Sequence, residues 1–201
     1  TFTLDIEKKC NPDLCIDILN FNISMLPEEF KHPDFIWFSP PCTHYSQAKR
    51  TGERDLITAN KIVQKCLALK EQLQPRYWIL ENPQTGLLKK QDFMSAIPYT
   101  DISYCKYGEK FRKQTRLWNN LSDWKARPIC KKDCDSMLGK KHIGSVGNYR
   151  KQYAAKSLLL RERYAIPKQL CEELVNCLEK TMEVTAECKE DSHVRLFAEK
   201  L

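Results

Sequence analysis

Two short apolar runs that flank an amphipathic segment constrain the fold of this chain most strongly. FIWF (residues 35–38) is a run of four apolar residues, and RYWILENP (residues 76–83) contains a second run. Such runs are typical of strands that are buried on both faces of a parallel sheet. Over residues 53–73, between the runs, apolar side chains recur every three or four positions, which predicts a helix. The order strand, helix, strand predicts an α/β fold with a doubly wound, Rossmann-like sheet.

Other segments are expected to extend this core. TFTLDI (residues 1–6) has the pattern of a strand that ends on an acid, and LCIDIL (residues 14–19) has that of a short strand or a turn. YTDISYCKYG (residues 99–108) and RLWNNL (residues 116–121) are predicted as further strands, and their pairing as an antiparallel hairpin is left open. The last predicted element is a helix over residues 167–182, with a proline near its first turn.

The composition limits the class of protein. A chain of 201 residues with 42% hydrophobic residues suits one domain of ordinary size. The sequence contains no apolar run of about 18 residues and no signal-peptide pattern, so we expect no membrane span and no secretion. An intracellular protein of the nucleus or cytoplasm is therefore predicted. The 10 cysteines are scattered among helical and strand patterns, and we interpret them as mostly reduced thiols.

Positive charge is concentrated in one part of the chain. The formal net charge is +7, and lysine and arginine are dense between residues 106 and 163, where aromatic residues are interleaved. Basic and aromatic side chains together suit contact with phosphates and stacking on bases. The pattern predicts a nucleic acid partner, and a solvated charged face is the alternative.

The two predicted core strands each run into residues that could carry chemistry. Pro40 and Pro41 end strand pairing and stiffen the turn that follows residues 35–38, so Cys42 is held at the carboxyl end of its strand. Glu81 follows the next apolar run and is expected at the same edge of the sheet. A positioned thiol can act as a nucleophile, and a carboxyl group beside apolar walls can donate a proton near neutral pH. The alternatives are a cysteine packed under a loop and an acid that caps a turn.

Several short motifs, in this order, resemble those of the cytosine-5 DNA methyltransferases, particularly the short forms of phages and large DNA viruses. The resemblance covers most of residues 1–121 and returns at residues 166–170. The motifs are SPPCTHYS (39–46), GERDL (52–56), ENP (81–83), YGEKFRKQTRLW (107–118) and IPKQL (166–170). Each motif alone is weak, so the resemblance rests mainly on the ordered set Cys42, Glu81 and Arg116.

The resemblance implies a base-flipping enzyme that transfers a methyl group to C5 of cytosine in DNA. Cys42 would add to C6 of the base and form a covalent adduct. Glu81 would hydrogen-bond to N3 or protonate it, and Arg116 would support the base or lower the pKa of the thiol. The base must leave the DNA stack to reach these groups. A methyltransferase for tRNA cytosine shares the mechanism and is left open.

The resemblance also implies S-adenosylmethionine as the methyl donor. Asp5 would hydrogen-bond to the ribose hydroxyls, Ile6 would contact the adenine, and Asp17 would face the exocyclic amine. Pro40 completes this donor-binding set. Without the resemblance, Asp5 and Asp17 are interpreted as acids that cap turns.

One motif of the family does not occur in the sequence. A strand and a glycine-rich turn, which receive the methionine part of the donor, are expected before Asp5, whereas the sequence begins at Thr1. We therefore expect a sheet that lacks its first strand here. One interpretation is that the sequence is a fragment of a longer chain, and another is that a homo-oligomer or a complementing chain closes the pocket. Alternatively, the protein is a catalytically inactive relative that binds nucleic acid.

The predicted organisation has three parts. Residues 1–118 form a partial catalytic core, residues 119–165 form a small basic target-recognition region, and residues 166–201 form a helical segment that returns to the core.

The basic region contains a weak candidate for a zinc site. Cys130, Cys134 and His142 could supply three ligands, and Cys105 is a candidate for the fourth. The spacing is not one of the strong zinc signatures, so unrelated thiols in a basic loop are the favoured interpretation and no metal is expected. A zinc-stabilised interaction module, with Cys42 merely buried, is a further alternative.

Overall fold

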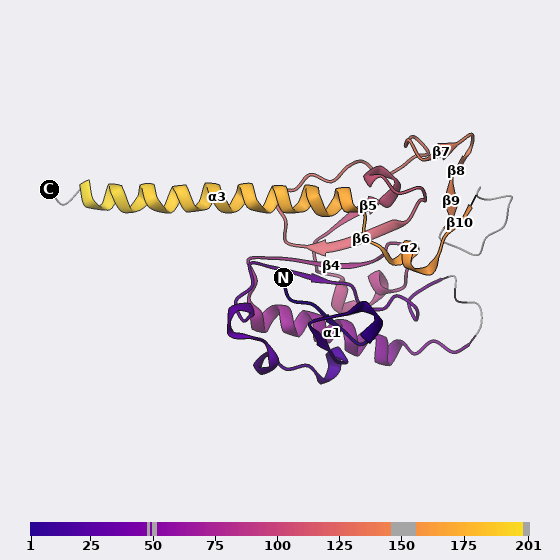
Figure 1. Ribbon diagram of the computed structural model, residues 1–201, viewed down its shortest axis with the longest axis horizontal. Coiled ribbons are helices and arrows are strands. Elements are labelled where there is room, and N and C mark those ends of the chain that lie inside the picture. The colour runs from indigo at the N-terminus through magenta and orange to yellow at the C-terminus, as the bar shows by residue number, and fades with distance from the viewer. Residues whose placement is uncertain (48, 50–51, 146–155, 199–201) are drawn as a thin grey trace. The chain divides into compact units, whose positions relative to one another are not determined.

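The computed structural model describes residues 1–47, 49, 52–145 and 156–198 (Figure 1). It divides into two compact units. The first is formed by Thr1–Ile102 with Gln114–Leu121, and the second by Ser103–Lys113 with Ser122–Leu201. The division by function, with a recognition region at residues 119–165, stays a prediction.

The first unit contains a four-stranded sheet in the order β3-β4-β6-β5. Its strands are β3 (Phe35–Phe38), β4 (Tyr77–Pro83), β5 (Tyr99–Ser103) and β6 (Gln114–Asn119). Strands β3 and β4 are parallel, and helix α1 (Leu56–Leu73) connects them, as predicted. Strand β6 runs antiparallel to β4, so the sheet is mixed. The α/β class is confirmed, whereas the Rossmann-like details and the lack of a first strand stay predictions.

Strands β5 and β6 are neighbours and run in opposite directions. The backbone N–H of Tyr104 donates to the carbonyl of Lys113 at 3.0 Å, and that of Asn119 donates to Pro98 at 3.1 Å. The residue number on β6 falls as that on β5 rises, so the two strands are antiparallel, an arrangement that the sequence left open. The prediction of a strand up to residue 108 was wrong, because the chain turns into a 3₁₀ helix at Tyr104–Tyr107 and then adopts φ = 90° at Gly108.

A separate two-stranded parallel sheet lies near the amino terminus. It consists of β1 (Leu4–Asp5) and β2 (Leu14–Cys15), with Asp5 paired to Cys15. Among the described residues of the first unit, six short 3₁₀ helices occur in the loops. They are Lys8–Cys10, Ile18–Asn20, Ile23–Met25, Glu28–Phe30, Leu88–Lys90 and Asp92–Met94.

Helix α1 supplies one side of the core of the first unit. Its buried residues recur at helical spacing, and they are Ala59, Val63, Cys66, Leu69 and Leu73. The first four pack in one cluster with Trp78, Leu80 and Trp118 of the sheet. The helix begins three residues after the predicted position 53 because Asp55 caps it, with its carboxylate accepting from the Thr58 N–H at 2.9 Å.

The described part of the second unit contains short strands, the 3₁₀ helix Tyr104–Tyr107 and the helices α2 and α3. Its strands form an antiparallel pair, β7 (Met137–Leu138) with β8 (Lys141–His142), and a parallel pair, β9 (Gly144–Ser145) with β10 (Lys156–Ser157). Helix α2 spans Leu160–Tyr164, and helix α3 spans Lys168–Ala198. The predicted helix at 167–182 is confirmed, but it continues further, since residues 183–198 contain neither glycine nor proline to end it.

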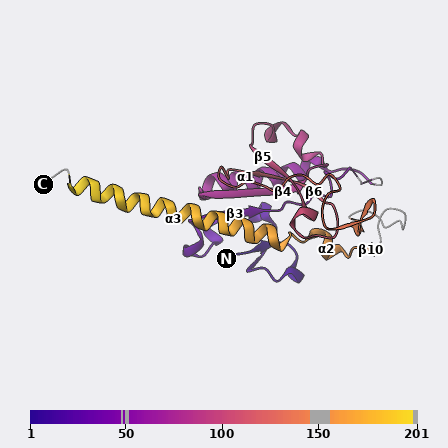
Figure 2. The ribbon, with the colours of Figure 1, turned by 90° about the horizontal axis from the view of Figure 1, so that it is seen from above.

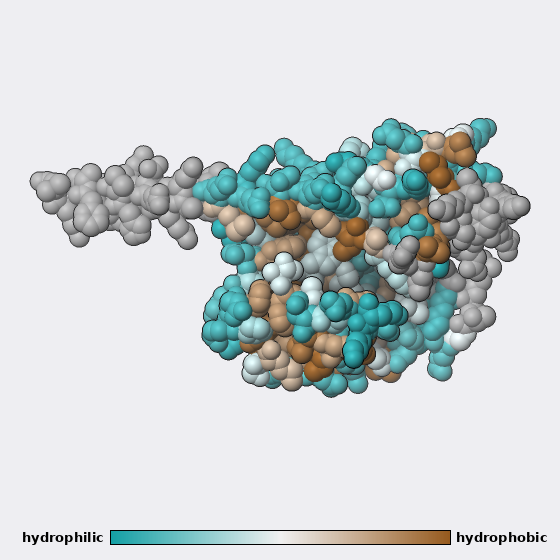
Figure 3. Space-filling view, in the orientation of Figure 1, coloured by the Kyte–Doolittle hydropathy of each residue, from teal (hydrophilic) through white to brown (hydrophobic). Residues whose placement is uncertain are grey.

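Helix α3 is a single continuous helix in both ribbon views (Figures 1 and 2). Among the described residues, no helix is both long enough and apolar enough to cross a membrane. Hydrophilic residues cover much of the visible surface, and hydrophobic residues form scattered groups on it (Figure 3).

Candidate active site

The ends of β3 and β4 bring the Pro-Cys motif and the Glu-Asn motif together. Phe38, the last residue of β3, pairs with Leu80, so the chain leaves β3 through Ser39 and Pro40 beside the point where β4 continues into Glu81 and Asn82. The side-chain Nδ2 of Asn82 donates to the carbonyl oxygen of Pro40 at 3.0 Å, and both residues are buried. The two motifs therefore meet at one edge of the sheet, and a direct hydrogen bond fixes one against the other.

The loop that follows Cys42 is held on two sides. The N–H of Tyr45 donates to the Cys42 carbonyl at 3.1 Å, and the wholly buried Tyr45 donates through its hydroxyl to Asn60 of α1 at 2.7 Å. The N–H of Leu87, in the loop after β4, donates to the Tyr45 carbonyl at 2.9 Å. Cys42 itself is partly exposed, whereas Cys66 is buried, and burial raises the pKa of that thiol to about 12. Of these two thiols, that of Cys42 is the one on a residue that solvent reaches.

Arg54 fastens the far part of the same loop. Its Nη1 donates to the carbonyls of His44 at 3.2 Å and Ser46 at 2.6 Å, and its Nη2 donates to the carbonyl of Lys49 at 3.0 Å. The Nδ1 of His44 accepts from the Asp55 N–H at 2.8 Å. A guanidinium group offers five donors in a rigid fork, so one arginine can hold several carbonyls. In the sequence, the segment GERDL was singled out only by its resemblance to the family, and the contacts of Arg54 with the loop carbonyls were not predicted.

Glu81 and Arg116 project from opposite faces of the sheet. The antiparallel register pairs Glu81 with Leu117 and Asn82 with Arg116. Successive side chains along a strand point to opposite faces, and directly paired residues share a face. Glu81, only 7% exposed, therefore shares a face with Leu117, whereas Arg116 shares one with Asn82.

Arg116 is engaged by the neighbouring strand β5. Its Nε and Nη2 atoms donate to the two carboxylate oxygens of Asp101 at 2.7 and 2.8 Å, which is a bidentate ion pair. Its Cζ atom lies 3.4 Å from the centre of the Tyr99 ring. The hydrogen bonds to Asp101 raise the pKa of Arg116 further. The sequence did not identify Asp101, because only the pairing of β5 with β6 places it beside the arginine.

Three of the four residues predicted to bind the donor, Asp5, Ile6 and Asp17, lie at the carboxyl ends of the parallel strands β1 and β2, whereas Pro40 follows β3. The Oδ1 of Asp5 accepts from the Glu7 N–H at 2.7 Å, and the Oδ1 of Asp17 accepts from the Leu19 N–H at 2.9 Å. Both acids thus cap turns, as the alternative interpretation predicted. Each carboxylate has a second oxygen and further acceptor capacity. Ile6, between them in sequence, is 64% exposed.

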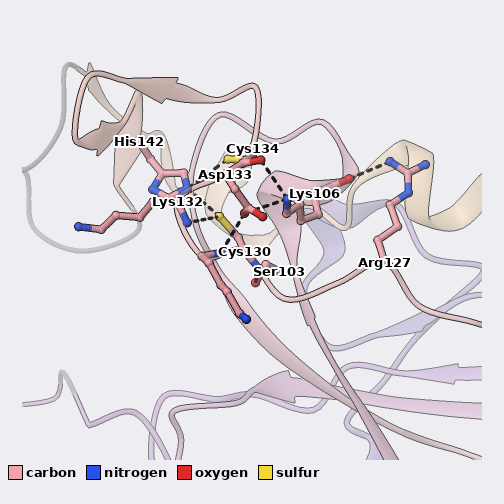
Figure 4. Close-up of polar contacts among 9 residues, drawn as sticks. Ser103, Lys106, Arg127, Cys130, Lys132, Asp133, Cys134 and His142 are labelled. Atoms are coloured by element: carbon pink, nitrogen blue, oxygen red, sulfur yellow. Dashed lines mark hydrogen bonds and ion pairs between the residues drawn. The ribbon is translucent and has the colours of Figure 1, made fainter.

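The weak zinc candidates are gathered in the second unit. The ligand atoms of Cys105, Cys130, Cys134 and His142 all lie within 4.8 Å of one another. The side chains of Cys130, Cys134 and His142 point toward one another (Figure 4). The expectation of unrelated thiols in a basic loop was therefore wrong about their positions, because the fold brings Cys105 to the loop that carries the others.

A basic hollow lies beside this cluster, in the same unit. Its volume is about 260 Å³, and its lining includes Arg112, Lys132, Lys140 and Lys141 as well as His142. The Nε atom of Arg112 is buried and has no hydrogen-bond partner among the described residues. Such a lining favours an anionic ligand.

Taken together, the first unit is an α/β core with a candidate nucleophile and a candidate acid on adjoining strand ends, a combination typical of group-transfer enzymes. Residues 6–97 match the sequence family described as C-5 cytosine-specific DNA methylase. The chain is also 27% identical over 187 residues to the "Probable DNA (cytosine-5)-methyltransferase" of Frog virus 3 (isolate Goorha). That match covers 82% of this chain and 84% of the viral protein. The resemblance seen in the sequence is confirmed, and the family points to cytosine-5 DNA methyltransferase activity.

Proposed function

We propose that this protein transfers a methyl group from S-adenosylmethionine to C5 of cytosine in DNA, through a covalent adduct on Cys42. The observation that carries the proposal is the hydrogen bond from Asn82 to Pro40. It joins the loop of the proposed nucleophile to the strand of the proposed acid, within the part of the chain that matches the family.

The proposed chemistry follows from the low nucleophilicity of cytosine C5. The Cys42 thiolate forms a bond to C6, and the electron pair of the C5–C6 double bond moves to C5. Glu81 hydrogen-bonds to N3 or protonates it, which neutralises the charge that the addition places on the ring. The electron pair on C5 would take the methyl group as its bond to the donor sulfur breaks, and the donor would leave as a neutral thioether. C5 then loses its proton to water, the double bond re-forms, and the Cys42 thiolate leaves. The base must be flipped out of the duplex, at a cost of a few kcal/mol.

The residues at the ends of β1 and β2 fit the adenosine part of the donor. Two acids at adjoining strand ends can accept hydrogen bonds from hydroxyl and amino groups, and the exposed Ile6 side chain offers an apolar surface for a purine. Pro40 remains a proposed contact to the donor. When bound, S-adenosylmethionine supplies an electrophilic methyl group.

For Arg116 we propose a positioning role instead of direct contact with the base. Its guanidinium forms a bidentate pair with Asp101, and the sheet register separates it from Glu81. The pair links β6 to β5, and Arg116 lies directly opposite Asn82. In this way it would support the strand segment that carries both Asn82 and Glu81.

DNA is the proposed substrate, and the basic hollow of the second unit is proposed to contact its phosphates. Four cationic side chains line a space of about 260 Å³. Phosphate contacts of this kind supply affinity that does not depend on sequence and that offsets the cost of base flipping.

The test is covalent capture of DNA that contains 5-fluorocytosine, in the presence of S-adenosylmethionine. Fluorine at C5 cannot leave as a proton does, so the adduct accumulates and survives denaturing electrophoresis. We expect capture by the wild-type chain, none by Cys42→Ser, and wild-type capture by Cys15→Ser, which changes an exposed cysteine of the same unit.

Other outcomes of this assay would refute the proposal. Binding of DNA without capture by the wild-type chain would indicate a catalytically inactive relative. Capture of a tRNA that contains 5-fluorocytosine in preference to DNA would show that tRNA is the substrate. Unchanged capture by Cys42→Ser would remove Cys42 from the mechanism.

A further inference from the structure

Four side chains with metal-binding atoms converge in the second unit, whereas the residues of the proposed methyl transfer belong to the first. Cys105 comes from the 3₁₀ helix Tyr104–Tyr107, Cys130 and Cys134 from the loop before β7, and His142 from β8. All four ligand atoms lie within 4.8 Å of one another. They are therefore contributed by three separate segments of the chain.

The separations match those of a tetrahedral metal site. Zn–S bonds of about 2.3 Å and Zn–N bonds of about 2.0 Å, at tetrahedral angles, put sulfur and nitrogen about 3.5 Å apart. In the structure, the Nε2 atom of His142 lies 3.5 Å from the Cys130 sulfur and 3.3 Å from the Cys134 sulfur. A zinc ion would thus need little movement of these side chains.

We propose that Cys105, Cys130, Cys134 and His142 bind one structural zinc ion in a Cys₃His site. Thiolate and imidazole are the ligands that zinc prefers, and four protein ligands complete its tetrahedral shell. No position is then left for water or substrate, so the site is structural and takes no part in the chemistry.

The surroundings of the cluster are those of a metal-binding turn. The Lys132 N–H donates to the Cys130 sulfur at 3.3 Å, and the Lys131 N–H donates to the Asp133 carboxylate at 2.9 Å (Figure 4). Lys132 has φ = 70°, a left-handed conformation that is uncommon for a residue other than glycine. Such a conformation persists where the surrounding contacts determine it, and N–H groups aimed at sulfur stabilise the thiolate.

The charges around the cluster also suit a bound zinc ion. Zinc with three thiolates and a neutral imidazole has a formal charge of about −1. Lys106, Lys132 and Arg112 lie near these ligands, and Lys106 is in turn held by Asp133 at 2.9 Å. The positive side chains therefore complement the charge of the complex.

The region around the cluster contains little regular secondary structure that could stabilise it without a metal. The residues from 122 to 136 contain no helix or strand, and β7 and β8 have two residues each. Such a segment buries little apolar surface on its own, and small elements of this kind are commonly stabilised by a structural metal. Zinc would tie this loop to the segment that carries Cys105 and so contribute directly to folding.

The first test is the metal content of the full chain. The protein is purified under reducing conditions without chelator, and its zinc content is measured by elemental mass spectrometry. We expect about one zinc per chain. Cys134→Ser and His142→Ala should weaken zinc binding at least about 10- to 100-fold, a range that loss of an outer-shell partner already produces. Cys171→Ser, which changes an exposed cysteine on α3 of the same unit, should retain the metal.

A second test does not depend on how well a variant folds. Cobalt(II) added to the metal-depleted wild-type chain should give the d–d bands of a tetrahedral site and thiolate-to-cobalt charge-transfer bands. His142→Cys should keep the tetrahedral spectrum and strengthen the charge-transfer bands, because it supplies a fourth thiolate. Absence of both zinc and a tetrahedral cobalt spectrum, a disulfide among these cysteines, or unaltered zinc in Cys134→Ser would each overturn the proposal. None of these results bears on methyl transfer, which the capture assay tests separately.

Discussion

The side-chain amide of Asn82 donates a hydrogen bond to the carbonyl oxygen of Pro40 at 3.0 Å. Asn82 is completely buried, and the two residues are 42 positions apart in the sequence. Pro40 begins the turn that presents Cys42, and Asn82 follows Glu81 on the neighbouring strand. One buried contact therefore sets the relative position of the two groups to which the chemistry is assigned.

Replacing Asn82 by alanine tests this contact. Asn82→Ala leaves the buried Pro40 carbonyl without its donor, which should destabilise the protein by about 1–3 kcal/mol. The variant should also capture 5-fluorocytosine DNA more slowly, because Cys42 and Glu81 lose their common support. Urea unfolding and the rate of capture measure the two effects.

Asn120→Ala is the matched control for that variant. The Asn120 side chain also bonds to backbone, accepting from Trp78 and donating to Arg76, but at the opposite end of β4. Its loss should lower stability without slowing capture in the folded protein. Equal capture rates for the two variants would show that the Asn82 contact does not position the site.

Arg116 and Asp101 should behave as a coupled pair. A double-mutant cycle with Arg116→Met and Asp101→Asn should give a coupling free energy of about 1–3 kcal/mol, since the pair is bidentate and largely shielded from water. Urea unfolding of the four proteins measures it.

The rates of capture then separate the two roles considered for Arg116. If Arg116 positions the strands, Asp101→Asn should slow capture about as much as Arg116→Lys does. If the arginine contacts the base, Asp101→Asn should leave capture nearly intact while Arg116→Lys reduces it, a result incompatible with the positioning role.

Arg54→Lys should loosen the loop beyond Cys42 while keeping the positive charge. A lysine ammonium cannot reproduce the fork that holds the carbonyls of His44, Ser46 and Lys49. We expect faster amide hydrogen exchange in residues 44–47 and slower capture, with little change in global stability. Lys61→Arg, at an exposed position of α1, should change none of these. Wild-type exchange in Arg54→Lys would show that the loop is held by other contacts.

Asp5→Asn should weaken binding of S-adenosylmethionine by roughly tenfold or more, as expected for loss of a hydrogen bond to a charged group. Asparagine can still accept the turn bond from Glu7, so the variant separates donor binding from capping. Asp13→Asn is the control, because Asp13 bonds to Thr3 beside the same strands. Calorimetry measures both affinities, and equal affinities would exclude Asp5 from the donor site.

Lys140→Ala combined with Lys141→Ala should reduce the salt dependence of DNA binding. Each phosphate contact contributes about 0.9 to the slope of log K against log salt concentration, so loss of two contacts should lower the slope by nearly 2. The paired control is Lys8→Ala with Lys9→Ala, two exposed lysines of the first unit. A titration of fluorescent duplex DNA at several salt concentrations gives both slopes. An unchanged slope of log K against log salt concentration would show that the DNA does not contact Lys140 and Lys141.

The local elements of this fold could be read from the sequence. Strands β3 and β4 are continuous apolar runs, and α1 has apolar residues at helical spacing, so neighbouring residues alone predict them. The position of Cys42 after two prolines and of Glu81 after an apolar strand is equally local. Boundaries that depend on other parts of the chain were less accurate. Residues 104–108 were predicted as strand but form a 3₁₀ helix and turn, and α3 continues beyond residue 182.

The tertiary structure decided which distant residues meet. The sequence did not predict that Asn82 would hydrogen-bond to Pro40 or that Asp101 would form an ion pair with Arg116. It also did not predict that Glu81 and Arg116 would lie on opposite faces of the sheet. The sequence offered Cys105, Cys130, Cys134 and His142 as weak zinc candidates, but the spacing of these residues along the chain favoured unrelated thiols. Each of these relationships depends on strand register and on loops that close over many residues. A shift of register by a single residue exchanges the faces of a strand, so the pattern of neighbouring residues does not determine them.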